Sequence, residues 1–146
     1  MGAAPRANIL VADVPEMEDV LRSCFSSHHV RYVTSFDEAV TLLRKTRYDM
    51  VVVGLTFDES HMFKLVHFVR SLDSYRAVPV VCVRGMPSVL SDDMRRGLRD
   101  AVHAIGGDDF IDFALRPNEL SELCRKLEDA LAGVPAEQVH TERFAW

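Results

Sequence analysis

The segment YDMVVVGL, residues 48–55, decides the fold of this chain. Its centre is an uninterrupted apolar run, Met50 to Val53, which stands between Asp49 and Gly54. A short run rich in β-branched residues and bounded in this way is typical of a strand that is buried on both faces. We therefore predict a central strand over residues 49–54, which ends in a loop at Gly54.

Amphipathic stretches alternate with further apolar runs on both sides of this strand. Ser35 is a suitable N-cap for one of the helices, because Glu38 follows three residues later and completes a capping box. Pro15 and Pro117 suit the first turns of two others. The predicted strands cover residues 8–12, 29–33, 49–54, 78–83 and 110–113, and the predicted helices cover residues 15–26, 35–45, 60–72, 88–104 and 117–131.

Five strands that alternate with five helices predict an α/β fold with a five-stranded parallel sheet covered on both faces. A barrel needs more units, so a doubly wound sheet with strand order 2-1-3-4-5 is favoured. The pattern indicates a single domain over residues 1–132, followed by a C-terminal tail over residues 133–146 that carries Phe144 and Trp146.

Composition narrows the class of protein. The chain has 146 residues, of which 48% are hydrophobic and 27% charged, as is ordinary for a globular domain. The net charge of −5 argues against direct binding of nucleic acid, which requires a concentrated basic surface. No apolar run approaches the ~18 residues of a membrane span. Residues 1–6 lack the apolar stretch of a signal peptide, so we expect a cytoplasmic protein.

The three cysteines, Cys24, Cys82 and Cys124, are far apart and show no CxxC spacing. An odd number of scattered cysteines fits a reducing compartment. We therefore expect three buried, unreactive thiols.

Two further segments carry a family resemblance. Residues 9–15, ILVADVP, lead from an apolar strand into an acidic residue and a proline, and residues 106–111, GGDDFI, lead from a glycine pair into the last strand. Together with residues 49–54, they resemble a response-regulator receiver domain, and the resemblance covers residues 7–131. It implies a CheY-like, flavodoxin-like three-layer sandwich, built as a (βα)5 unit, with a role in two-component or phosphorelay signalling.

The resemblance also implies a site that has lost its usual residues. Gly54 stands where the family carries the aspartate that accepts a phosphoryl group, and Ala12 and Asp13 stand at the two acidic positions of the first strand. Arg84 stands at the position of a threonine or serine, and Phe113 at that of a lysine. Phosphoryl transfer to a carboxylate needs a divalent cation held by several oxygens, and Asp13 alone does not supply them. We expect no metal, no cofactor and no enzymatic activity.

Other residues could compensate for the missing groups. Arg84 could enter the pocket and pair with Asp13. Asp58 and Glu59 follow Gly54 closely, but acids at the start of a helix commonly complement its dipole.

The last predicted strand can be aligned with the receiver family in a second way. Arg116 and Pro117 are similar to the Lys-Pro pair of the family, but this match needs three extra residues. Counting from Phe110 favours Phe113 instead.

The stretch from Arg84 to Gly106 is longer than the resemblance implies. Its helix mixes apolar and charged residues, which suits a binding face, although charge pairs on a plain surface helix explain the pattern equally well. In receiver domains the helix, strand and helix corresponding to residues 88–104, 110–113 and 117–131 form an output and dimerisation face. The resemblance thus implies a protein partner or a homodimer, with a candidate face formed by Met94, Arg95, Leu98, Arg99 and Phe110.

Two functions follow from these residues. The first is a degenerate receiver, or pseudo-receiver, that acts through protein contacts without phosphorylation. The alternative is a sensor of a small ligand or anion, which would use the pocket at the carboxyl ends of the strands. Gly54 and Ala12 would enlarge that pocket, and Arg84 would favour an anion.

Overall fold

The computed structural model describes residues 6–133 and contains one five-stranded parallel sheet. The strand order is β2-β1-β3-β4-β5, which confirms the predicted α/β topology. All neighbouring strands are parallel, so their carboxyl ends meet at one edge of the sheet. The strands are β1 (Asn8–Ala12), β2 (His29–Val33), β3 (Met50–Gly54), β4 (Val80–Met86) and β5 (Asp109–Ala114).

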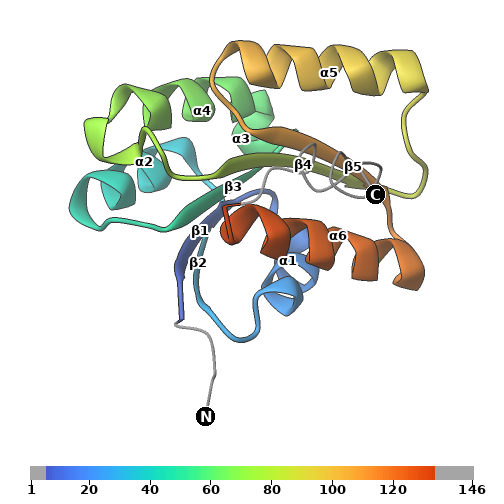
Figure 1. The fold of residues 1–146 in the computed structure, drawn as a ribbon, viewed down its shortest axis with the longest axis horizontal. Helices are drawn as coiled ribbons and strands as arrows, with labels where there is room; N and C mark the ends of the chain where they lie inside the picture. The colour runs from blue at the N-terminus through green and yellow to red at the C-terminus, as the bar shows by residue number, and fades with distance from the viewer. Residues whose placement is uncertain (1–5, 134–146) are drawn as a thin grey trace, which may run out of the picture.

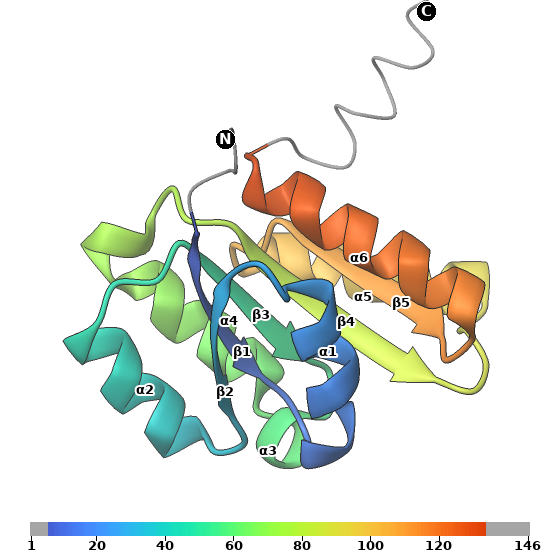
Figure 2. The same ribbon diagram turned by 90° about the horizontal axis from the view of Figure 1, so that it is seen from below.

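Helices cover both faces of the sheet and make three layers (Figure 1). The helices α2, α4 and α5 lie on one face, and α1 and α6 lie on the other (Figure 2). The predicted tail beyond residue 133 lies outside the described residues. The helices are η1 (Pro15–Met17), α1 (Glu18–Cys24), α2 (Phe36–Lys45), α3 (Phe57–Ser60), α4 (Met62–Ser71), η2 (Asp73–Tyr75), α5 (Asp92–Ala104) and α6 (Pro117–Leu131).

The central strand β3 is the most deeply buried element, as its sequence predicts. All five of its residues are buried. Val51 and Val53 belong to the core on the side of α2 and α4, while Val52 belongs to the core beneath α1 and α6. The side chains alternate between the two faces as strand geometry requires. The loop that follows Gly54 is therefore anchored by a strand that is buried on both sides.

The predicted helix over residues 88–104 begins later than its sequence suggests. Helix α5 starts at Asp92, because Ser91 caps it and accepts a hydrogen bond from the backbone N–H of Met94. Just before it, the backbone N–H of Leu90 donates to the carboxylate of Asp112 at 2.6 Å. These contacts hold residues 87–91 as a loop beside the end of β5.

The expectation of three free thiols is wrong for two of the cysteines. Cys24 of α1 and Cys124 of α6 form a disulfide across a sequence separation of 100 residues, and Cys82 is a buried free thiol. The sequence placed both bonded cysteines on helices, but it did not show that these helices lie side by side (Figure 2). The inference of a reducing compartment, which rested on unpaired cysteines, therefore loses its support.

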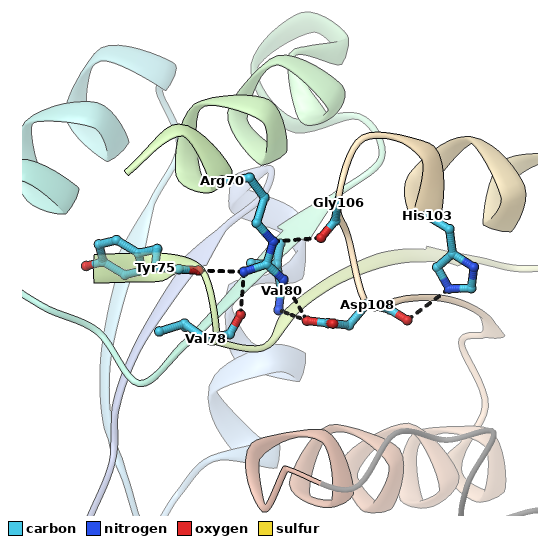
Figure 3. Close-up of polar contacts among 7 residues, drawn as sticks. All are labelled: Arg70, Tyr75, Val78, Val80, His103, Gly106 and Asp108. Carbon is cyan, nitrogen blue, oxygen red and sulfur yellow. Dashed lines mark hydrogen bonds and ion pairs between the residues drawn. The ribbon is translucent and has the colours of Figure 1, made fainter. Parts of the chain in front are cut away.

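An arginine joins three segments at the amino ends of β4 and β5 (Figure 3). Arg70, at the end of α4, is 17% exposed in its side chain. Its guanidinium donates hydrogen bonds to the carbonyl oxygens of Tyr75, Val78 and Gly106, at 2.6, 2.7 and 2.7 Å, and to the carboxylate of Asp108 at 2.8 Å. A single side chain thus satisfies three loop carbonyls and one acid.

The acid in this cluster is shared with the sheet. The carboxylate of Asp108 also accepts a hydrogen bond from the backbone N–H of Val80 at 2.8 Å, at the first residue of β4. The ring of His103 lies 2.9 Å from the Asp108 carbonyl oxygen (Figure 3). The cluster therefore locks the start of β4 to the turn that leads into β5.

Within residues 6–133, no helix has the length and apolarity that crossing a membrane requires.

Candidate functional site

The carboxyl ends of β1, β3 and β4 border a pocket of about 370 Å³. The loop after each strand and the short helix η1 complete its wall. Such an edge of a doubly wound sheet is where ligands of this fold class bind. The lining residues are Asp13, Val14, Glu16, Met17, Leu55, Thr56, Val83, Arg84, Gly85, Met86 and Leu115.

Asp13 lies directly over Gly54. A Cβ atom placed on Gly54 would come within 2.0 Å of the Asp13 Cγ and Oδ1 atoms. The carboxylate of Asp13 therefore occupies the space that a side chain at residue 54 would need. The glycine and the aspartate fit one another, since any larger residue at position 54 would have to displace the carboxylate.

Burial changes the acidity of Asp13. The residue is only 3% exposed, and its Oδ1 atom accepts a hydrogen bond from the backbone N–H of Val14 at 2.7 Å. Desolvation raises the pKa of Asp13 to about 6, and the nearby charge of Glu16 adds to the increase, although the Val14 bond opposes it. At neutral pH the carboxylate is thus mostly ionised, but its charge is costly.

Arg84 does not pair with Asp13, which corrects the predicted ion pair. Its guanidinium contacts the carboxylate of Asp112 at 2.8 Å and the carbonyl oxygen of Ser88 at 3.2 Å. Arg84 and Asp112 are partners in the register of β4 and β5, so their side chains meet across the strands. The Asp112 side chain is 0% exposed, and Arg84 therefore neutralises a buried acid.

The other residues predicted around the pocket are less central to it. Ala12 is 0% exposed and packs in the core on the side of α2 and α4. Phe113 is buried in the opposite core, where its ring and the Met17 side chain both lie close to Gly85. Of the predicted set, Asp13 and Arg84 line the pocket, and Gly54 lies beneath Asp13.

Asp58 does not replace the missing acid of β3. Its carboxylate accepts a hydrogen bond from the backbone N–H of Phe36, the first residue of α2, at 2.6 Å. Asp58 and Glu59 have left-handed backbone conformations, with φ of 43° and 57°. This turn carries Asp58 away from Gly54 to the start of a neighbouring helix.

The predicted interaction face needs one correction. Phe110 is 0% exposed, because it points into the core beneath α5 and cannot belong to a surface. Leu98 is partly buried against the same core, and Arg99 pairs with Asp109 at 3.2 Å. Met94, in contrast, is 58% exposed.

Three exposed apolar residues were not in the predicted face. Met86, Val89 and Leu115 are 44%, 45% and 43% exposed. Met86 ends β4, and its carbonyl oxygen accepts a hydrogen bond from the Leu115 N–H at 3.0 Å. Two of the three, Met86 and Leu115, also line the pocket. Their position at or just beyond the carboxyl ends of two parallel strands is the sequence signal that identifies them.

Replacement of Asp13 by asparagine is expected to stabilise the protein near neutral pH. The folded-state pKa of Asp13 lies above its ordinary value of 3.8, so the native state holds the proton more tightly than the unfolded state. The contribution of the protonated Asp13 to the free energy of unfolding is fully present below about pH 4. It is lost as the pH rises through about 6. Asparagine keeps the acceptor for Val14 and removes the charge, with an expected gain of up to roughly 3 kcal/mol.

Urea unfolding of both proteins across this pH range measures the effect. The difference between them should vanish near the acid end of the range. Asp19→Asn is the matched control, because Asp19 is exposed on the next helix and its replacement should have little effect at any pH. An equal pH dependence of wild type and Asp13→Asn would contradict the assignment.

The chain resembles solved receiver structures, although no protein-family model and no curated protein matches it. A putative response regulator from Chloroflexus aurantiacus is 20% identical, with a TM-score of 0.66 over 88% of this chain and 99% of that chain. The receiver domain of a histidine kinase from Syntrophus aciditrophicus is 23% identical, with a TM-score of 0.67 over 89% and 93%. The chemotaxis response regulator CheY4 of Vibrio cholerae is 16% identical, with a TM-score of 0.69 over 86% and 99%. This chain therefore has the fold of response-regulator receiver domains.

Proposed function

We propose that the chain is a pseudo-receiver, a protein-interaction module of two-component or phosphorelay signalling that acts without phosphorylation. Its role is regulatory contact and not catalysis. The observation that carries the proposal is the pair of Gly54 and Asp13 at the end of β3. By the resemblance of the sequence, Gly54 is expected to stand where receiver domains carry their phosphoacceptor aspartate.

The geometry at β3 supports this proposal. Gly54 has no side chain, and the Asp13 carboxylate fills the space above it. Asp58 is held by the start of α2, and Arg84 is held by Asp112. Phosphoryl transfer needs an aligned acceptor and concentrated positive charge around the transferred group. The pocket is lined by Asp13, Glu16 and an Arg84 that is already paired, and Gly54 offers no side chain to accept a phosphoryl group.

Contacts with a protein partner would use the exposed apolar side chains near the ends of β4 and β5. Met86, Val89, Met94 and Leu115 are each more than two-fifths exposed and lie on or beside consecutive segments of one edge. Exposed apolar clusters of this kind mark interaction sites. A homodimer through α5, β5 and α6 is part of the same proposal, with Met94, Arg95, Leu98 and Arg99 on its face.

Treatment with acetyl phosphate and Mg²⁺ is expected to leave the intact mass of the protein unchanged. The reason is that the described pocket offers no carboxylate in the position of the family acceptor. A canonical receiver domain treated in parallel should gain one phosphoryl group and lose it on addition of hydroxylamine. A hydroxylamine-sensitive phosphoryl group on this chain would contradict the proposal, and peptide mapping would identify the residue that accepts it.

A small-ligand sensor is the second candidate, and the pocket of about 370 Å³ is the observation that favours it. The anion form of this hypothesis has lost its main support, because Arg84 is paired with Asp112. The charge that remains in the pocket is that of Asp13 and Glu16.

A further inference from the structure

The carboxylate of Asp13 is buried but incompletely paired. Its Oδ1 atom accepts the hydrogen bond from Val14, whereas its Oδ2 atom has no hydrogen-bond or ion-pair partner within residues 6–133 and keeps solvent-accessible surface on the side of the pocket. Buried carboxylates in proteins are nearly always paired with a cation or with several donors. Because Asp13 lines the pocket, a donor can reach Oδ2 from that side.

The charges around the pocket favour a cation. Its charged lining residues are Asp13, Glu16 and Arg84. Arg84 contacts the fully buried carboxylate of Asp112 at 2.8 Å, so its positive charge is already matched. Glu16 acts on Asp13 as a like charge. The formal charges that remain unmatched in the lining are therefore negative, and a cation at Asp13 Oδ2 would relieve both the repulsion by Glu16 and the cost of desolvation.

The walls of the pocket suit an organic cation better than a metal ion. Met17, Leu55 and Val83 are buried or half-buried members of the lining, and Met86 and Leu115 are its exposed members. A hard divalent cation needs several oxygen ligands, which these side chains do not provide. An aliphatic stem can lie along them while its charged end reaches the carboxylate, as lysine and arginine side chains commonly do.

The hydrogen bonding of Asp13 distinguishes between the two basic side chains. A guanidinium binds best when it engages both oxygens of a carboxylate in parallel. One of the two oxygens of Asp13 is already bound to the backbone of Val14. An ammonium group is compact and needs a single oxygen, so it fits the remaining acceptor.

We propose that this pocket binds a lysine side chain of a partner protein, with its ammonium group on Asp13 Oδ2 and its methylene stem between Met86 and Leu115. The inference rests on the proposed interaction function only in naming a protein as the carrier of the lysine. The preference for an alkylammonium group rests on the pocket alone. A bound lysine would contact both the exposed apolar side chains of the lining, Met86 and Leu115, and the buried acid Asp13.

Titration of the full chain with n-butylammonium near neutral pH, followed by amide NMR, tests the chemical class. Saturable shifts are expected for the amides of Asp13, Val14 and Leu55. Asp13→Asn, which keeps the shape and the Val14 bond, should weaken binding by roughly tenfold or more. Asp19→Asn should bind as the wild type does, because Asp19 lies outside the pocket lining.

Three other ligands separate the alternatives. Butanol should bind far more weakly than butylammonium, and equal binding would mean that the site is only apolar. Butylguanidinium should bind more weakly than butylammonium, and the reverse order would overturn the choice of lysine. If Mg²⁺ displaces butylammonium at lower concentration than a matched monovalent salt does, the site is a metal site and the proposal fails.

A tripeptide with both ends blocked and lysine at its centre tests the carrier. Binding that Asp13→Asn abolishes, and that acetylation of the lysine also abolishes, supports a partner lysine. Binding of butylammonium without binding of the peptide would overturn the partner lysine and indicate a free amine as ligand. The phosphodonor test is independent of both results, since a chain that accepts phosphate could still bind an amine at Asp13.

Discussion

Replacement of Arg70 by alanine is expected to lower the free energy of unfolding by roughly 4 kcal/mol, a large effect for one residue. The guanidinium holds the carbonyl oxygens of Tyr75, Val78 and Gly106 and the carboxylate of Asp108. Its removal leaves two part-buried carbonyl oxygens and two exposed acceptors without this donor, and each loss of a charge-assisted bond costs about 1.5 to 3 kcal/mol before relaxation. The total is less than their sum because water enters part of the site.

Chemical denaturation of the variant measures this effect, with two controls. Arg70→Lys keeps the charge but has too few fixed donors for four partners, so it should recover only part of the loss. Arg76→Ala removes an arginine whose side chain is 77% exposed and paired with the likewise exposed side chain of Asp73, and it should change stability by less than about 0.5 kcal/mol. Equal effects at Arg70 and Arg76 would show that the cluster does not hold β4 and β5.

The predictable part of this structure is the part that periodicity determines. Residues 50–53 form a buried central strand. The alternation of apolar runs with amphipathic stretches predicts the parallel sheet, and this prediction does not depend on which side chains pair with one another. The late start of α5 was harder to see. It depends on the Ser91 cap together with the bond between Leu90 and Asp112, two residues that are far apart in sequence.

The position of the candidate pocket was predictable, but the contacts of its side chains were not. The carboxyl edge of the sheet follows from the topology, and Asp13, Gly54 and Arg84 all lie there. The partner of Arg84 depends on the register between β4 and β5, which places it beside Asp112. The fit of the Asp13 carboxylate over Gly54 depends on a side-chain conformation, and sequence periodicity contains no information about that.

The cysteines show the same limit. Each was correctly placed on a helix or strand, but pairing depends on which helices are neighbours. In a doubly wound sheet of this strand order, the first and last helices cover the same face. Applied to Cys24 and Cys124, that rule would have brought the two residues together, and the reasoning from cysteine number alone did not use it.

Loss of the Cys24–Cys124 disulfide is expected to destabilise the fold by about 4 kcal/mol. The bond closes a loop of 100 residues, and the chain-entropy relation assigns about 4.7 kcal/mol to such a loop, with native packing and residual structure reducing the gain. Denaturation with and without reductant measures the effect on the wild type. The double variant Cys24→Ser, Cys124→Ser should be destabilised by a similar amount and should be insensitive to reductant.

The free thiol of the third cysteine, Cys82, provides an internal control for this experiment. Cys82 is a free thiol that is 0% exposed, and burial raises its pKa to about 12, so it should react with alkylating agents only after unfolding. The unreduced wild type should therefore show one reactive thiol when denatured and three after reduction. Three thiols without reductant would contradict the disulfide. A wild type that is equally stable with and without reductant would show that packing between α1 and α6, and not the covalent bond, holds these helices on the sheet.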